Sequence, residues 1–324
     1  MAVELVNLGP DRRRSSLPSR LTAAGCGLLA SIGLGASPVL PMVALAATGP
    51  PTCADLAPAH VLAEDGVQGE TPDGSVLTAL ATYRTRHDAD RGLRVQDDPD
   101  PDAVRAQLAG RTGTAAASVT RLSSTSGAPA GCGTAPRPFI AGAPSGAVWI
   151  DGLAQQGQAN WYFCGPASLA EVAATTGHPV DQGTAAAWMG TNSRDGTTVA
   201  AMTGGLNHFV GQPIAHRDYY EFVWLDYIPT ADQRSAFLQR LEYDVQHGWP
   251  LIGDAWEVPG GPHLVGHPPH QELFHWFEIG GYGPNGDSVY YADSATTLWS
   301  GVRPYSWYDT QTLVTILGGR GYDW

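Results

Sequence analysis

The stretch Gln158-Ala-Asn-Trp-Tyr-Phe-Cys164-Gly-Pro-Ala-Ser-Leu169 places a cysteine where a helix is expected to begin. Pro166 suits the first helical turn, because the N–H that proline lacks would have no partner there. Apolar residues then recur at helical spacing as far as Gly177, which predicts a helix over residues 164–176. The helix dipole and the free backbone N–H groups at this end favour a thiolate over a thiol. The sequence therefore indicates that Cys164 is an activated nucleophile.

A glutamine stands six residues before this cysteine. When a thiolate attacks a carbonyl carbon, the substrate oxygen gains negative charge, which a side-chain amide and the backbone N–H of Cys164 can stabilise together. Gln156 competes for this role, but the six-residue offset lets a turn bring the amide of Gln158 back beside the thiol. We therefore predict that Gln158 is the oxyanion donor.

A thiol nucleophile also needs an imidazole to take its proton, and the imidazole needs an acceptor that orients it. His275 lies near the start of a predicted strand over residues 274–282, and Asp293 directly follows a second predicted strand, Ser288–Ala292. Asn285-Gly286 between the two strands is typical of a hairpin, because both residues tolerate positive φ. Antiparallel pairing would bring the two side chains together, so we predict His275 as the base and Asp293 as its orienting residue.

Other residues of the same types compete for these two roles. Asp287 falls in the turn and Asp309 lies beyond the second strand. Three histidines precede the first strand in a loop: His263, His267 and His270. Only His275 lies on the strand itself, which favours it as the base.

The four closely spaced histidines also support a different hypothesis, a secreted metal-binding protein or a metallohydrolase. Against it, Pro262, Pro268 and Pro269 would break any helix that aims the rings together, and the chain has no HExxH pattern. We therefore expect no metal and no cofactor.

The N-terminus has the features of a secretion signal. Arginines at positions 12, 13, 14 and 20 precede an apolar stretch of small residues, and Ala44-Leu45-Ala46 resembles a cleavage site. Prolines and glycines interrupt the apolar run, which argues against a retained membrane span. We interpret residues 1–46 as a signal and expect a secreted protein without stable membrane insertion.

The cysteines fit an extracellular protein. Cys26 would leave with the signal, so that Cys53, Cys132 and Cys164 remain. Secreted proteins seldom keep free thiols, so a disulfide between Cys53 and Cys132 would leave Cys164 free for chemistry. The alternative is that all three are buried free thiols.

Composition divides the rest of the chain. Residues 47–146 are rich in small and polar residues, with a short predicted helix over 102–108 and a linker-like stretch over 110–131. This segment could be a disulfide-stapled module, a pro-segment or a spacer. Residues 147–324 hold all ten tryptophans and form the predicted main domain.

The main domain is predicted to be α+β. Its first half has helical patterns over residues 164–176, 182–189, 198–209 and 231–247, and its second half has strand patterns over 251–256, 274–282, 288–292 and 302–308. Helices followed by antiparallel strands are typical of this class. We expect a cleft between the two halves.

Net charge excludes some functions. The chain carries a formal charge of −13, so it lacks the positive charge with which proteins neutralise nucleic-acid phosphates. It also contains no lysine, which excludes Schiff-base and lysine-dyad chemistry.

The run from Gln158 to Leu169, together with Phe274-His275-Trp276-Phe277-Glu278-Ile279-Gly280-Gly281-Tyr282 and Tyr291-Ala292-Asp293, resembles the papain-like cysteine peptidases. Within them it is most similar to the bacterial branch related to the double-glycine leader peptidases of bacteriocin exporters. The resemblance spans roughly residues 150–315. It implies a two-lobed fold, with a helical lobe followed by an antiparallel sheet. It also implies catalytic roles for Cys164, His275 and Asp293 and the oxyanion role for Gln158.

We therefore expect a secreted cysteine peptidase or amidohydrolase that acts on a peptide or protein. The chain shows no membrane or ATPase portion of an exporter, so leader-peptide substrates do not carry over. Alternatives are an acyltransferase or an amidase directed at cell-wall material, both with the same triad, and a non-catalytic binding module.

Overall fold

The computed structural model describes residues 66–88, 100–111, 113, 115, 117–121 and 143–324. The described elements all belong to one unit, Pro51–Trp324. The predicted signal and the predicted disulfide partners Cys53 and Cys132 lie outside the described residues, so secretion and the disulfide stay predictions. Among the described helices, none has the length and apolar character needed to cross a bilayer.

The centre of this unit is a mixed sheet that is antiparallel except at one edge. Its main path has the order β1-β8-β7-β6-β5-β9-β4, and β3 pairs with β2 and with β6. Only β1 and β8 pair in parallel among the strands described. The strands are β1 (Val67–Gln68), β2 (Val119–Arg121), β3 (Val148–Ile150), β4 (Phe222–Trp224), β5 (Leu251–Glu257), β6 (Leu273–Tyr282), β7 (Ser288–Ala292), β8 (Tyr305–Asp309) and β9 (Gly321–Asp323).

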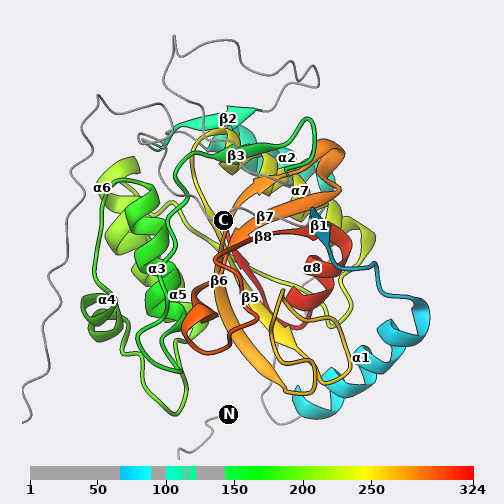
Figure 1. The fold of residues 1–324 in the computed structure, drawn as a ribbon. Coiled ribbons are helices and arrows are strands. Elements are labelled where there is room, and N and C mark those ends of the chain that lie inside the picture. The colour runs from blue at the N-terminus through cyan, green and yellow to red at the C-terminus, as the bar shows by residue number, and fades with distance from the viewer. Residues whose placement is uncertain (1–65, 89–99, 112, 114, 116, 122–142) are drawn as a thin grey trace, which may run out of the picture. The chain divides into compact units, whose positions relative to one another are not determined.

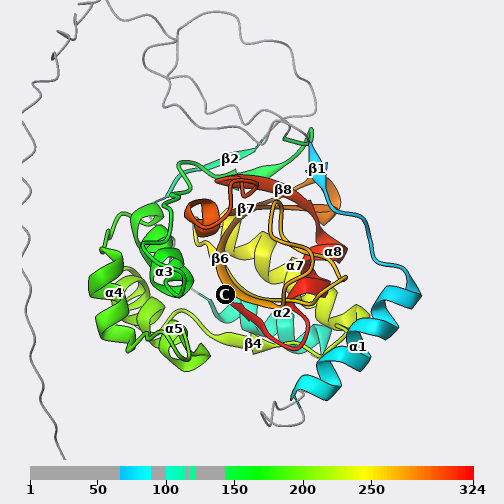
Figure 2. The ribbon, with the colours of Figure 1, turned by 60° about the horizontal axis from the view of Figure 1, so that its bottom comes forward.

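Helices cover both faces of the sheet. Figures 1 and 2 show α3, α4 and α5 grouped on one side of the strands, and α7 and α8 on the other. The helices are α1 (Gly74–Asp88), α2 (Pro101–Gly110), α3 (Cys164–Thr175), α4 (Gln182–Met189), α5 (Val199–Leu206), a π-helical turn (Asn207–Gly211), α6 (Gln212–Ala215), α7 (Ala231–Gln246) and α8 (Thr310–Leu317), with short 3₁₀ turns at Pro284–Gly286 and Ser294–Thr297.

Side chains of β6 alternate between the two layers, as the pleat of a strand requires. Trp276 belongs to the apolar cluster around α3, and Ser168 of α3 donates a hydrogen bond to its carbonyl at 2.9 Å. Phe277 and Ile279 belong to the cluster formed with α7 and α8. The long central strand is thus buried on both faces, which fixes the position of its first residues.

The predicted hairpin is confirmed. Asn285 and Gly286 both have positive φ, 58° and 69°, in the turn that joins β6 to β7. The helices predicted over 164–176, 182–189 and 231–247 are also present, each within one residue at its end.

Two element boundaries differ from the prediction. The helix expected over 198–209 ends as an α-helix at Leu206 and continues as the π-helical turn. The strand expected over 302–308 begins only at Tyr305, after Pro304, which has no N–H to donate to a neighbouring strand.

Segments before residue 147 add elements to the same unit. Arg84 of α1 is buried and donates hydrogen bonds to the carbonyls of Tyr227, Trp256 and Thr315. In the stretch predicted to be a linker, β2 pairs with β3 instead. The division at residues 46 and 146 stays a prediction, but α1, α2, β1 and β2 pack as parts of the sheet domain.

Candidate active site

Cys164 is the first residue of α3. The preceding Phe163 has no side-chain group that caps the helix. The thiol is free and half-buried, so it is neither sealed in the core nor bridged to another cysteine. The dipole and the first N–H groups of α3 therefore face a reachable sulfur, as the sequence predicts.

The loop between α4 and α5 packs directly on this helix end. A Cβ atom at Gly165 would lie 2.3 Å from the hydroxyl of Thr197, so only glycine allows this approach. The carbonyl of Thr197 accepts a hydrogen bond from the indole N–H of Trp276 at 3.1 Å, and its hydroxyl pairs with that of Thr191 at 2.7 Å. These contacts build one wall beside Cys164.

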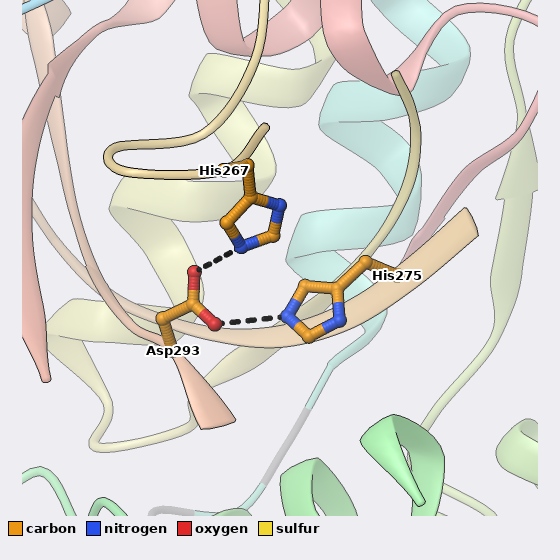
Figure 3. A group of neighbouring side chains, drawn as sticks. All are labelled: His267, His275 and Asp293. Atoms are coloured by element: carbon orange, nitrogen blue, oxygen red, sulfur yellow. Dashed lines mark hydrogen bonds and ion pairs between the residues drawn. The ribbon is translucent and has the colours of Figure 1, made fainter. Parts of the chain in front are cut away.

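His275 and Asp293 meet as the hairpin predicts. The Nε2 atom of His275 lies 3.0 Å from Oδ1 of Asp293, and both side chains are buried (Figure 3). The backbone N–H of Ala295 donates to the same carboxylate oxygen at 2.8 Å. Oδ1 of Asp293 is thus held both by the ring of His275 and by the backbone N–H of Ala295.

Cys164 is also a neighbour that affects the protonation of His275. Burial of His275 opposes a positive charge, but the charge of Asp293 and the hydrogen bonds to Asp293 and Cys164 outweigh it and hold the pKa of His275 well above its usual value. His275 thus has Asp293 at 3.0 Å on one side, and Cys164 is a second group that acts on its ring.

Gln158 is buried in the irregular segment that leads to α3. Its side-chain N–H donates to the carbonyl of Asn160 at 2.8 Å, and its side-chain oxygen accepts from the hydroxyl of Ser294 at 3.3 Å. Its backbone N–H donates to the carbonyl of Ser294 at 2.8 Å. Gln158 is thus tied to the residue that follows Asp293.

A second histidine, His267, enters the same cluster (Figure 3). Its Nε2 atom lies 3.1 Å from Oδ2 of Asp293, and its Nδ1 atom lies 2.9 Å from Oε2 of Glu257. The sequence marks His267 only as a rival to His275 and as one of a possible metal cluster. Glu257 carries no sequence signal, because it is simply the last residue of a buried strand.

The other rival residues have local contacts elsewhere. The ring of His263 bonds to the carbonyls of Gly261 and Gln271, and His270 is exposed. Asp287 accepts a hydrogen bond from the hydroxyl of Ser288, and Asp309 caps α8. The four histidines of the metal hypothesis therefore do not converge; only His267 and His275 do, on Asp293.

Two further carboxyl groups are buried between α3 and β6. Glu171 accepts the backbone N–H of Gln156 at 2.9 Å, and Glu278 accepts the hydroxyl of Thr175 at 2.9 Å. Burial, and then the charge of a neighbouring carboxylate, raise the pKa of both groups well above the usual value. Glu171 and Glu278 therefore favour the neutral carboxylic acid form.

A groove of about 730 Å³ runs along α5 and the edge strand β4. Its lining includes Val199, Thr203, Asn207, Phe222 and Trp224. Phe222 packs edge-on against Trp276, with ring centroids 6.1 Å apart. The groove thus adjoins the loop and the indole that form the wall beside Cys164.

Comparison with solved structures finds distant similarities to peptidases. The peptidase domain of Streptococcus ComA, a bi-functional ABC transporter involved in quorum sensing, is 15% identical, with a TM-score of 0.32, over 53% of this chain and 95% of that one. A C39-like peptidase assigned in Bacillus anthracis is 13% identical, with a TM-score of 0.34, over 53% and 92%. Digestive procathepsin L 3 of Tenebrio molitor is 12% identical, with a TM-score of 0.33, over 77% and 90%. Comparison with curated proteins gave no match.

The model of the Peptidase C39 like family matches residues 150–314, about half of the chain. This match contains α3 with Cys164, β6 with His275, and Asp293. The mixed architecture is the α+β papain-like fold that the sequence predicts, with its helices and antiparallel strands in the expected order. The chain therefore belongs to the Peptidase C39 like family of cysteine peptidases.

Proposed function

We propose that this protein is a cysteine peptidase that cleaves peptide bonds with Cys164 as nucleophile and His275 as base and acid. The observation that carries the proposal is the row formed by the half-buried thiol, the imidazole and the carboxylate of Asp293, with a direct Nε2 to Oδ1 distance of 3.0 Å. The peptidase family supports a peptide or protein substrate.

In this mechanism the Cys164 thiolate attacks the carbonyl carbon of the scissile bond. A sulfur–carbon bond forms while the carbonyl electrons move to the oxygen. His275, protonated in the resting ion pair, then gives its proton to the leaving amine, and the carbon–nitrogen bond breaks. Water, deprotonated by the now neutral His275, hydrolyses the thioester and restores the thiolate and the imidazolium.

The negative oxygen of each tetrahedral intermediate needs donors. An amide group has two N–H bonds, and one N–H of Gln158 is directed to Asn160. We assign the second to the oxyanion, together with the backbone N–H of Cys164 at the start of α3. The buried ties between Gln158 and Ser294 hold the amide in place before substrate arrives.

The groove along α5 and β4 is the surface we assign to the substrate chain. Its aromatic side chains and its position next to the wall of Cys164 suit an extended peptide. We also propose that the enzyme acts outside the cell. Support for this comes from the signal-like composition of residues 1–46.

The decisive experiment replaces the nucleophile. Cys164→Ala should reduce hydrolysis of a fluorescent casein by about 10⁴-fold or more, because no covalent intermediate can form. Circular dichroism and the urea midpoint should stay close to those of the native protein, since the sulfur is only half-buried. Hydrolysis by Cys164→Ala at the native rate would reject the mechanism.

The oxyanion assignment predicts a separate effect at Gln158. Gln158→Ala should reduce hydrolysis by about 10²- to 10³-fold, the usual loss for one oxyanion donor. Alkylation of Cys164 by iodoacetamide should change little, because alkylation develops no oxyanion. If alkylation and hydrolysis fall by the same factor, Gln158 supports the shape of the site and is not a donor.

A further inference from the structure

His267 occupies a buried position with a carboxylate on each side. It lies in the loop between β5 and β6, and its side chain is 0% exposed. Its ring packs edge-on against His275, with centroids 5.0 Å apart, and lies 5.0 Å from the ring of Trp299. Glu257 and Asp293 face its two nitrogens at 2.9 and 3.1 Å. The ring of His267 is therefore buried between two carboxylates and is not a solvated side chain.

The loop is built to hold this ring. Leu264 donates its backbone N–H to Glu257 at 2.9 Å, and Val265 donates to the hydroxyl of Tyr291 at 3.0 Å. Gly266 passes so close to the backbone of Gly301 that no Cβ atom would fit there. These contacts set the ring between the two carboxylates.

The hydrogen bonds determine the proton count. A neutral imidazole has one N–H, yet both nitrogens of His267 lie at hydrogen-bonding distance from carboxylate oxygens. Backbone N–H groups donate to the other oxygen of Glu257 and to Asp293, which favours both carboxylates in their charged form. The proton that satisfies every contact therefore belongs on His267, as an imidazolium.

Charges then alternate through the site. Glu257 from β5 is negative, His267 positive, Asp293 after β7 negative, and His275 on β6 positive. Burial of His267 opposes its charge, but Asp293 and Glu257 together raise its pKa above the usual value. Each buried charge thus has an opposite neighbour, which offsets the cost of burial.

We propose that His267 is a positioning residue that stays protonated and fixes the second oxygen of Asp293, so that the first oxygen remains directed at His275. This inference rests on the proposed function, because the row it supports is the one that would activate Cys164. Without His267, Oδ2 of Asp293 would be buried beside Glu257 with no donor between two like charges. One of the carboxylates would then take up a proton more readily, and His275 would lose its counter-ion.

The same atoms raise a metal alternative, since ligand atoms of His267, His275 and Asp293 all lie within 4.8 Å of one another. A metal ion needs a lone pair on each ring nitrogen, however, and an imidazolium has none. The two hypotheses therefore differ in the number of protons on His267.

The first experiment reads these protons directly. Nitrogen NMR of the full chain with labelled histidine, assigned through the His267→Gln variant, should show two protonated ring nitrogens at His267 at about pH 8, above the ordinary histidine pKa. A neutral His267 at about pH 7 would overturn the proposal. Loss of its N–H signals on addition of one equivalent of zinc would overturn it as well, in favour of a metal site.

The second experiment measures the rate at which iodoacetamide alkylates Cys164 across pH. His267→Gln should move the acidic limb of this profile upward by about one pH unit or more, because the carboxylates bind protons more readily. Removing Glu257 as well, in His267→Gln/Glu257→Gln, should restore part of the shift, since the like charge is gone. His263→Gln, in the same loop, is the matched control, because the ring of His263 bonds to backbone carbonyls of Gly261 and Gln271 and to no carboxylate among the described residues.

A failure of the proposed peptidase function can be distinguished from a failure of the proposal for His267. A native thiol that is inert to iodoacetamide below about pH 7 would sink the proposed peptidase, while the NMR result would still decide the state of His267. If the native thiol reacts but the acidic limb of the alkylation profile is not shifted in His267→Gln, then His267 only fills space and the proposal is wrong. If His267→Gln fails to fold, the NMR measurement on the native chain still tests the proposal.

Discussion

Asp293, which directly follows β7, and Glu278, which lies on β6, are both completely buried, yet their pKa values are shifted in opposite directions. Burial alone disfavours charge on either carboxyl. The two histidines overcome this at Asp293 and hold its pKa well below the usual value. At Glu278 burial and the nearby charge of Glu171 raise the pKa well above it.

The difference comes from the partners that each face of the strand supplies. Asp293 accepts hydrogen bonds from His267, His275 and the N–H of Ala295. Among the described residues, Glu278 accepts a hydrogen bond from the hydroxyl of Thr175 alone. A buried carboxylate is stable where cations and N–H groups meet it, and a buried carboxylic acid is stable where they do not. The carboxyl group of Asp293 is therefore charged, whereas that of Glu278 on β6 is neutral.

Replacing Asp293 by a neutral side chain should have the largest effect, and this effect is on kcat. Asp293→Asn keeps the size of the side chain but removes the charge that stabilises the His275 imidazolium. We expect kcat to fall by about 10³- to 10⁴-fold, as expected when the orienting carboxylate of such a triad is lost. The rate is measured with the same fluorescent casein, across pH.

The same variant should change the pH dependence of stability. Because the pKa of Asp293 is lowered in the folded protein, its contribution is present above the unfolded pKa of about 3.9 and is lost as pH falls through the folded pKa. The urea midpoints of Asp293→Asn and the native protein should therefore converge as the solution is acidified. A gap that widens on acidification would contradict the charged state of Asp293.

Much of this site could be predicted from sequence because its signals are local. Cys164 precedes a proline in the first turn of a periodic helix, and Asn285-Gly286 determines a hairpin. Once the hairpin forms, the register of β6 and β7 brings His275 to Asp293 without any long-range information. The order of helices and strands follows from periodicity in the same way.

Glu257 and His267 could not be predicted because their roles depend on a loop. The fifteen residues between β5 and β6 have no periodicity, and their path is set by contacts such as Gly266 against Gly301. The docking of Arg84 onto carbonyls of three separate segments is likewise invisible in the sequence. Residues before 147 are poor in aromatics, which hides that they supply edge strands and helices to the sheet.

Removing the neutral acid should have the smallest effect, and one of opposite sign to that at Asp293. Glu278→Gln keeps an oxygen that accepts the Thr175 hydroxyl, so we expect little change in stability near pH 3, well below the unfolded pKa of about 4.3, because the acid is neutral there in both folded and unfolded protein. As pH rises above about 4.3, the unfolded chain loses its Glu278 proton while the folded protein keeps it. This difference lowers the free energy of unfolding of the native protein by up to about 1.4 kcal/mol per pH unit. The decrease continues until pH reaches the raised pKa of Glu278 in the folded protein.

Glu278→Gln cannot lose this proton, so it should become more stable relative to the native protein as pH rises from about 4.3. Urea unfolding at several pH values measures the difference, and Glu70→Gln, which removes an exposed carboxylate, is the control. The argument requires opposite slopes for Asp293→Asn and Glu278→Gln. Equal slopes would mean that burial, and not the partners on each face of β6, sets the charge of both groups.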